Sequence, residues 1–189
     1  MLNSMGRPIL PKPATVFYGW WLVCIGAFTM AVVISPIFQG LGVFFVTLER
    51  QFGWSRATLA GAFSLARAED TLIGPVAGYL TDRIGSRRMV FIGFLTLGVG
   101  YLLFSSIQNI AMFYAAFFVL TIGGGLAGFL PIMGAVNNWF VRRRATAMGI
   151  TQSGINLGGA LIVPALAWGV TTMGWRITAI AIAVIMFAV

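Results

Sequence analysis

The sequence predicts an all-α, polytopic membrane protein, and three observations lead to that fold class. Apolar residues make up 59% of the 189 residues and charged residues only 8%, against roughly 25% charged residues in soluble domains. The mean hydropathy is +0.95, and the apolar residues gather in runs of the length that crosses a bilayer, about 20 residues per helix. Most of the 12 basic residues lie in short clusters between those runs, as they do in the loops of membrane proteins.

The apolar runs divide the chain into a short tail and one transmembrane bundle. Residues 1–16 are expected to form an N-terminal tail rather than a helix, because they are rich in proline. The distribution of basic residues, described below, places this tail in the cytoplasm. Residues 17–189 are expected to form the bundle, with five complete spans and the beginning of a sixth. The expected spans are about 17–48, 56–80, 89–107, 111–140, 145–172 and 177–189.

The last apolar run is short for a span. Its thirteen residues would form about 20 Å of helix at ~1.5 Å per residue, whereas the hydrocarbon core is ~30 Å thick. We therefore expect the sixth helix to be truncated and the chain to be a piece of a longer protein whose C-terminal bundle is absent. A half-size, six-span membrane subunit without transport activity of its own is the alternative.

The basic residues predict the orientation in the membrane. Eight lie in the tail and in the loops after spans two and four, and three lie at the opposite ends of the spans. The positive-inside rule then places the N-terminus in the cytoplasm of a multi-pass protein, which we expect in a bacterial-type inner or plasma membrane. The larger group is Arg7, Lys12, Arg83, Arg87, Arg88, Arg142, Arg143 and Arg144; the smaller is Arg50, Arg56 and Arg176.

Several functional classes are disfavoured by composition. The chain has one cysteine and no histidine, so neither an intrachain disulfide nor a metal site is expected, and no cofactor is predicted. The net charge of +8 does not indicate nucleic-acid binding, because the basic residues form no continuous face. We expect no enzyme, since no pair of nucleophile and base is recognisable.

A polar segment, residues 78–88 (GYLTDRIGSRR), separates the second and third apolar runs. We expect residues 81–83 to end one helix, Gly85 to allow a tight reversal, and residues 87–88 to begin the next helix with their charges in water. We call residues 78–88 the loop motif.

The loop motif resembles the signature loop of the major facilitator superfamily of secondary transporters, through the pattern Gly78-xxx-Asp82-Arg83-x-Gly85-x-Arg87-Arg88 between spans two and three. Residues 138–149 and 174–176 are similar to weaker signatures of that family. The resemblance implies the N-terminal six-helix bundle of a major facilitator fold, with the substrate bound between this bundle and a second one.

The resemblance also implies a gating role for the loop motif. Gly78 would allow a helix of the second bundle to approach closely, and Asp82 would face the positive N-terminal end of that helix and pair with nearby arginines. We call this arrangement the latch of the outward-facing state. For Arg87 and Arg88 the alternative is that they only obey the positive-inside rule. The residues assigned to gating are Gly78, Asp82, Arg83, Gly85, Arg87 and Arg88.

Within the superfamily, residues 18–21 (YGWW), 42–45 (GVFF) and 52–55 (FGWS) resemble the group of monocarboxylate transporters and oxalate/formate antiporters. Two departures are that Tyr18 replaces an acidic residue and that residues 17–48 contain no charged residue. The resemblance implies a secondary active transporter, working by alternating access, for a small organic anion such as a monocarboxylate, with proton coupling or exchange. A drug/proton antiporter of the same superfamily is the alternative.

The most polar stretch inside a predicted span is residues 64–71 (SLARAEDT). A charge at bilayer depth costs at least ~2.5–3.5 kcal/mol, so Arg67, Glu69 and Asp70 need partners or water. At ~100° per residue, Asp70 lies within about 60° of Arg67, whereas Glu69 points roughly 200° away. Arg67 and Asp70 can therefore form a local ion pair, and Glu69 needs another partner.

Two hypotheses account for these charges. In the first, Arg67 attracts a substrate carboxylate and Glu69 or Asp70 carries the coupled proton, because a buried carboxyl group can take up a proton near neutral pH. In the second, the charges neutralise one another and hold helices together.

Four further polar residues are candidates for contact with substrate or protons: Gln39, Asn137, Gln152 and Asn156. Gln152 and Asn156 share one face of span five, which suits a cavity. Gly154 and Gly158 lie on the other face, which suits close contact with a helix.

Overall fold

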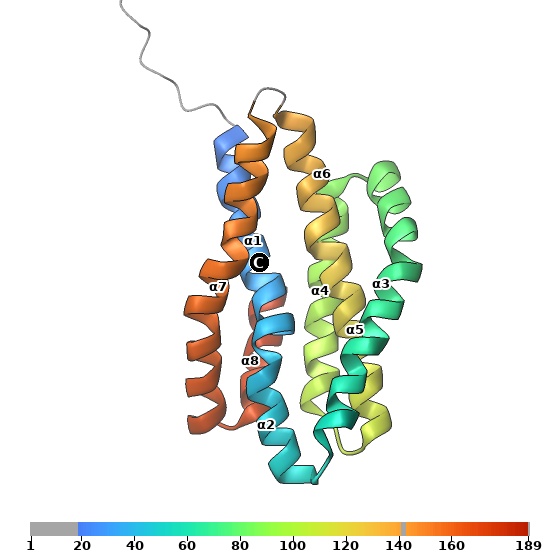
Figure 1. The fold of residues 1–189 in the computed structure, drawn as a ribbon, viewed down its shortest axis with the longest axis vertical. Coiled ribbons are helices and arrows are strands. Elements are labelled where there is room, and N and C mark those ends of the chain that lie inside the picture. The colour runs from blue at the N-terminus through green and yellow to red at the C-terminus, as the bar shows by residue number, and fades with distance from the viewer. Residues whose placement is uncertain (1–18, 141–142, 189) are drawn as a thin grey trace, which may run out of the picture.

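The computed structural model describes residues 19–140 and 143–188, apart from the side chains of Asp70, Leu72 and Ile73. Those residues form helices joined by short turns, arranged as a bundle of roughly parallel rods (Figure 1). The helices are α1 (Gly19–Ile34), the π-helix η1 (Ser35–Gln39), α2 (Leu41–Phe52), α3 (Arg56–Ile84), α4 (Ser86–Ser105), α5 (Ile110–Ala127), α6 (Phe129–Trp139), α7 (Arg144–Thr172) and α8 (Trp175–Ala188).

Four of these helical stretches are both long and apolar enough to cross a membrane: Gly19–Phe52, Ser86–Ser105, Ile110–Trp139 and Arg144–Thr172. The sequence predicted five complete spans, so α3 is the exception. It has 29 residues, or about 43 Å at ~1.5 Å per residue, but the charges near Arg67 lower its hydropathy. The helix α8, with 14 residues, is a shorter apolar helix.

The helix ends differ from the expected spans, in part because helices continue into polar residues beyond their apolar parts. The helix α3 runs to Ile84 rather than Leu80, and α4 covers 86–105 rather than 89–107. The first span continues to Phe52 instead of Leu48, and the fourth is interrupted at Gly128. The reversal at Gly85 has a φ of +89°, which glycine adopts without steric cost.

The basic clusters gather at one end of the bundle. Figure 1 shows the start of α1, the α3–α4 turn, the end of α6 and the start of α7 at the same end, and the α2–α3, α4–α5 and α7–α8 turns at the other. The described arginines of the loop motif therefore share an end with Arg143 and Arg144. This is the grouping that the positive-inside argument requires, while the orientation across a membrane stays a prediction.

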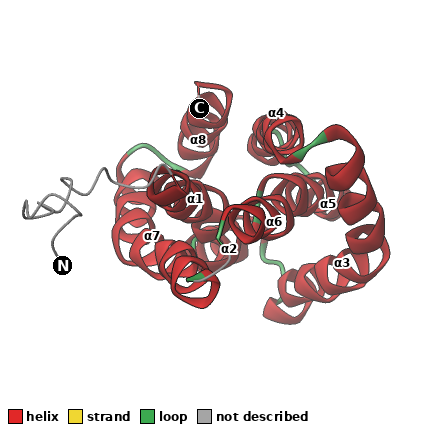
Figure 2. Ribbon diagram, turned by 90° about the horizontal axis from the view of Figure 1, so that it is seen from above, coloured by secondary structure: helices red, strands yellow, loops and turns green. Residues whose placement is uncertain are grey.

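Viewed along the rods, the bundle has two flanks and a back (Figure 2). The helix α7 packs on α1 at one flank, α3 packs on α5 at the other, and α4 and α8 lie side by side at the back. We number the rods in chain order. The first rod is α1, η1 and α2, the second α3, the third α4, the fourth α5 and α6, the fifth α7 and the sixth α8. The first and fourth rods stand between the flanks. Each of these central rods has a break in its middle, at η1 and at Gly128.

Glycines bring the helices into close contact, as the sequence predicted for span five. A Cβ atom at Gly154 would lie 2.2 Å from the Ala27 carbonyl oxygen, and one at Gly158 would lie 2.3 Å from the Ser35 hydroxyl oxygen. Any side chain at these positions would push α7 away from α1. Small residues at helix contacts are the usual solution in membranes, where apolar side chains gain little by leaving lipid.

Several aromatic rings of the largest buried cluster pack together toward the end of the bundle that is poor in arginine. The Phe44 and Phe104 rings meet edge to face at 5.4 Å between centroids, and Phe104 meets Trp175 at 6.0 Å. The Trp175 indole N–H donates to the Gln51 side-chain oxygen. These contacts join the first, third and sixth rods. Fewer large rings are buried at the opposite, arginine-rich end.

Candidate functional site

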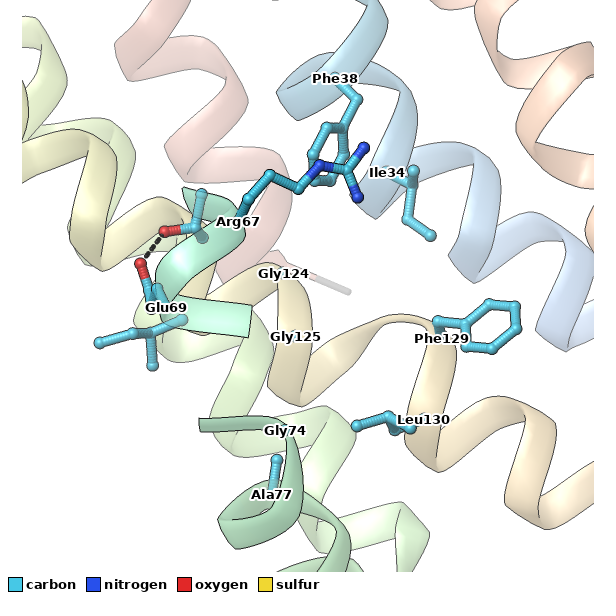
Figure 3. A pocket seen from close by; sticks show the side chains of 12 residues that line it. Ile34, Phe38, Arg67, Glu69, Gly74, Ala77, Gly124, Gly125, Phe129 and Leu130 are labelled. Atoms are coloured by element: carbon cyan, nitrogen blue, oxygen red, sulfur yellow. Dashed lines mark hydrogen bonds between the residues drawn. The ribbon is translucent and has the colours of Figure 1, made fainter. Parts of the chain in front are cut away.

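A cavity of about 380 Å³ lies between the first, second and fourth rods, at the level of the two breaks. We call it the Arg67 cavity. Its polar lining residues are Arg67 and Glu69 of α3 and Thr121 of α5, and its apolar walls include Phe38, Phe129 and Gly125 (Figure 3).

Arg67 presents its guanidinium group to the open part of the cavity. The side chain is exposed, and Figure 3 shows it directed toward the wall formed by Ile34 and Phe38. The Thr71 hydroxyl, one turn later, donates to the Arg67 carbonyl oxygen at 3.0 Å. Among the described lining residues Arg67 is the one cation. This wall of the cavity therefore attracts negatively charged groups.

Glu69 leaves the same helix in another direction and is 5% exposed. The Thr121 hydroxyl donates to a Glu69 carboxylate oxygen, which joins α3 to α5 (Figure 3). The Thr121 oxygen also lies 3.1 Å from the Phe117 carbonyl oxygen and 3.0 Å from that of Phe118. The structure therefore agrees with the helical geometry that turned Glu69 away from Arg67, and it supplies a partner for Glu69.

Glycines leave room on the floor of the Arg67 cavity. No described atom lies within 4 Å of a Cβ built on Gly74 or on Gly125. Gly128, between α5 and α6, is different, because a Cβ there would lie 2.4 Å from the Gly124 carbonyl oxygen. The break at Gly128 thus depends on glycine, and it is followed at once by Phe129, which lines the cavity.

The other polar candidates lie apart from Arg67. Gln39 donates to the Ile155 carbonyl oxygen at 3.4 Å. Gln152 and Asn156 are exposed and line a separate depression of about 330 Å³ on α7. Asn137 is half-buried in α6, and its carbonyl oxygen accepts a hydrogen bond from Arg144 at 3.3 Å. The side chain of Asp70, and with it the predicted ion pair to Arg67, lies outside the described part of the chain.

The loop motif lies at the surface of the described bundle, with open space beside Gly78. No described atom lies within 4 Å of a Cβ built on Gly78, and Asp82, Arg87 and Arg88 are exposed. Arg83 lies over the Tyr79 ring, 5.6 Å from its centroid. Among the described side chains Asp82 forms no ion pair, so its pairing in the latch stays a prediction.

Sequence reasoning missed most of the lining of the Arg67 cavity, including Thr121, Phe38 and Phe129. Thr121 carried a signal, because it is the lone hydroxyl in the apolar stretch 115–133. The two phenylalanines carried none, since an apolar ring in a span usually faces lipid or another helix.

A family model described as the Major Facilitator Superfamily matches residues 23–189, which is most of the chain. The chain belongs to the Major Facilitator Superfamily. This membership confirms the predicted fold class, a helical bundle of the major facilitator type in an integral membrane protein.

Individual members of the superfamily are also similar to this chain. Monocarboxylate transporter 13 from Bos taurus is 28% identical over 84% of this chain. Monocarboxylate transporter 11 from Mus musculus is 29% identical over 88% of it, and monocarboxylate transporter 14 from Homo sapiens is 29% identical over 90%. The matched segments cover 37%, 38% and 33% of those proteins, so the chain spans about a third of the length of the curated relatives it matches. The resemblance to the monocarboxylate group is confirmed.

Proposed function

We propose that this chain forms the N-terminal part of a secondary active transporter that carries a small monocarboxylate across the membrane by alternating access. One observation carries the proposal: an exposed guanidinium, that of Arg67, and a buried carboxyl group, that of Glu69, line the same cavity inside the bundle. The relatives named above, all monocarboxylate transporters, support the substrate class.

Arg67 is proposed to bind the substrate carboxylate. A guanidinium donates two parallel hydrogen bonds to a carboxylate, and such charge-assisted bonds are about twice as strong as neutral ones. The open position of Arg67 leaves its donors accessible. In the alternative role, Arg67 and the acidic residues of its helix would neutralise one another and hold helices together.

Glu69 is proposed to carry the coupled proton. Its carboxyl group is buried beside the anion site and hydrogen-bonded to Thr121. A substrate carboxylate adds one negative charge to the cavity, and proton uptake by Glu69 would restore the charge balance before the loaded protein changes conformation. An uncompensated charge inside a membrane is costly, so this balance would couple substrate to proton, whether the net reaction is symport or exchange.

The loop motif is proposed to form the latch at the cytoplasmic side of the same cycle. Gly78 and the exposed Asp82 offer a polar, uncovered surface at the arginine-rich end of the bundle. A second bundle that docks there by a helix N-terminus would close the inner side. The proposal includes a cytoplasmic N-terminus and residence in a plasma membrane or bacterial-type inner membrane.

The test is uptake of radiolabelled pyruvate into proteoliposomes that contain the protein expressed from its own gene. With an inside-alkaline gradient of one pH unit, one proton per pyruvate is expected to give about tenfold accumulation, because one pH unit corresponds to ~1.4 kcal/mol. Empty liposomes and liposomes treated with a protonophore serve as controls. Uptake of a cationic drug analogue, together with no uptake of pyruvate, would favour a drug/proton antiporter instead.

A further inference from the structure

The Arg67 cavity combines one described cation with exposed aromatic walls. We infer that the preferred substrates are monocarboxylates that carry a phenyl-sized apolar group, such as phenylpyruvate, rather than acids of one to three carbons. This inference rests on the transport function proposed above.

The first argument is that the aromatic side chains lining the cavity are exposed. Phe38 is 39% exposed and Phe129 is 46% exposed, although both line the same cavity as Arg67. Leu130 adds further apolar surface at 41% exposed. In Figure 3, Phe38 lies on the wall toward which Arg67 points, and Phe129 and Leu130 lie across the cavity from it. A ligand held by Arg67 would therefore have apolar surface on two sides of its remaining atoms.

The second argument is space. The volume of 380 Å³ corresponds to roughly a dozen waters at ~30 Å³ each in the liquid. Acetate or pyruvate bound to Arg67 would leave most of this volume as water against phenyl rings. The open positions above Gly74 and Gly125 enlarge the region next to the aromatic walls. An apolar substituent would displace that water and gain the free energy of apolar burial.

The third argument concerns charge. Arg67 is the one cation among the described lining residues, and Glu69 lies in the same lining. Against these lining residues, a second carboxylate on the ligand would thus meet an acidic residue and apolar walls rather than another cation. Pockets of this type use a few polar groups to fix orientation and an apolar majority for affinity, which favours one carboxylate and one apolar group.

The test compares uptake of pyruvate with uptake of phenylpyruvate in proteoliposomes that contain the protein expressed from its own gene. The two acids differ by one phenyl group. The KM for phenylpyruvate is expected to be about tenfold lower or more, as burial of a phenyl-sized group implies. A KM for phenylpyruvate equal to or above that for pyruvate would overturn the inference and leave the proposed function in place. Absence of Arg67-dependent uptake for both acids would contradict the two together.

Variants of the cavity wall test whether the preference for phenylpyruvate arises in the Arg67 cavity. Phe38→Ala and Phe129→Ala are each expected to reduce the ratio of the two KM values about fivefold, because each removes part of the apolar wall. The matched control is Phe91→Ala, since Phe91 is an exposed phenylalanine of α4 that lines a different depression. If the ratio of the two KM values is unchanged in both cavity variants, as it is in the control, then Phe38 and Phe129 do not cause the preference and this part of the inference is overturned. The ratio in the unmodified protein needs no variant and tests the inference even where a variant folds poorly.

Discussion

Arg67→Ala should lower kcat/KM for pyruvate uptake at least about 30-fold, because removal of one partner of a desolvated charge pair costs ~2 kcal/mol or more. The side chain is exposed and makes no side-chain hydrogen bond within the described residues, so its truncation should not disturb the packing of α3. Arg67→Lys keeps the charge but loses the planar pair of donors, and we expect an intermediate loss. Initial rates of labelled pyruvate uptake over a range of concentrations measure the effect.

The control for this prediction is Arg56→Ala. Arg56 stands at the start of the same helix and pairs with Glu49 at 3.1 Å, with 85% of its side chain exposed. Exposed ion pairs contribute little to stability, so pyruvate uptake should stay close to that of the unmodified protein. Equal uptake in Arg67→Ala and Arg56→Ala would show that Arg67 does not bind the substrate.

Glu69→Gln should abolish accumulation driven by a proton gradient while it preserves exchange of pyruvate for pyruvate. Glutamine cannot carry a proton, but its amide oxygen can still accept the hydrogen bond from Thr121 that joins α3 to α5. Under a gradient of one pH unit, the accumulation ratio is expected to fall from about ten to about one. The measurement is the steady-state ratio of labelled pyruvate inside and outside proteoliposomes.

Glu49→Gln is the matched control for Glu69→Gln, because Glu49 is a carboxylate near the α2–α3 turn and outside the cavity. It should accumulate pyruvate as the unmodified protein does. A Glu69→Gln variant that still accumulates pyruvate about tenfold would refute proton carriage by Glu69. Asp70 would then be the next candidate.

Hydropathy and charge predicted the rods of the bundle and the ends at which their arginines gather, because both signals are local in the sequence. The angular spacing of residues on an α-helix predicted that Arg67 and Glu69 leave α3 in different directions. Steric arguments predicted the contact of Gly154 and Gly158 with another helix, although the identity of that helix was not predictable.

The residues that line the Arg67 cavity were less predictable from the sequence. Thr121 lies 52 residues after Glu69, and nothing local joins the two. The π-helix at Ser35–Gln39 and the break at Gly128 depend on packing between rods, so hydropathy treats each interrupted rod as one uniform span. The phenyl rings of Phe38 and Phe129 look like any apolar side chain of a membrane helix until the fold places them beside a guanidinium.

The central claim is that a monocarboxylate occupies the Arg67 cavity, and substrate protection of a single cysteine tests it most directly. Gly125→Cys places a thiol in open space, because no described atom outside its own stretch of helix lies within 4 Å of the Cβ. The exposed Cys24 and any further native cysteine are replaced by serine in the same variant. Saturating pyruvate should slow labelling of this variant by a water-soluble maleimide severalfold, and the protection should disappear when Arg67→Ala is added. Labelling at the same rate with and without pyruvate would contradict the claim.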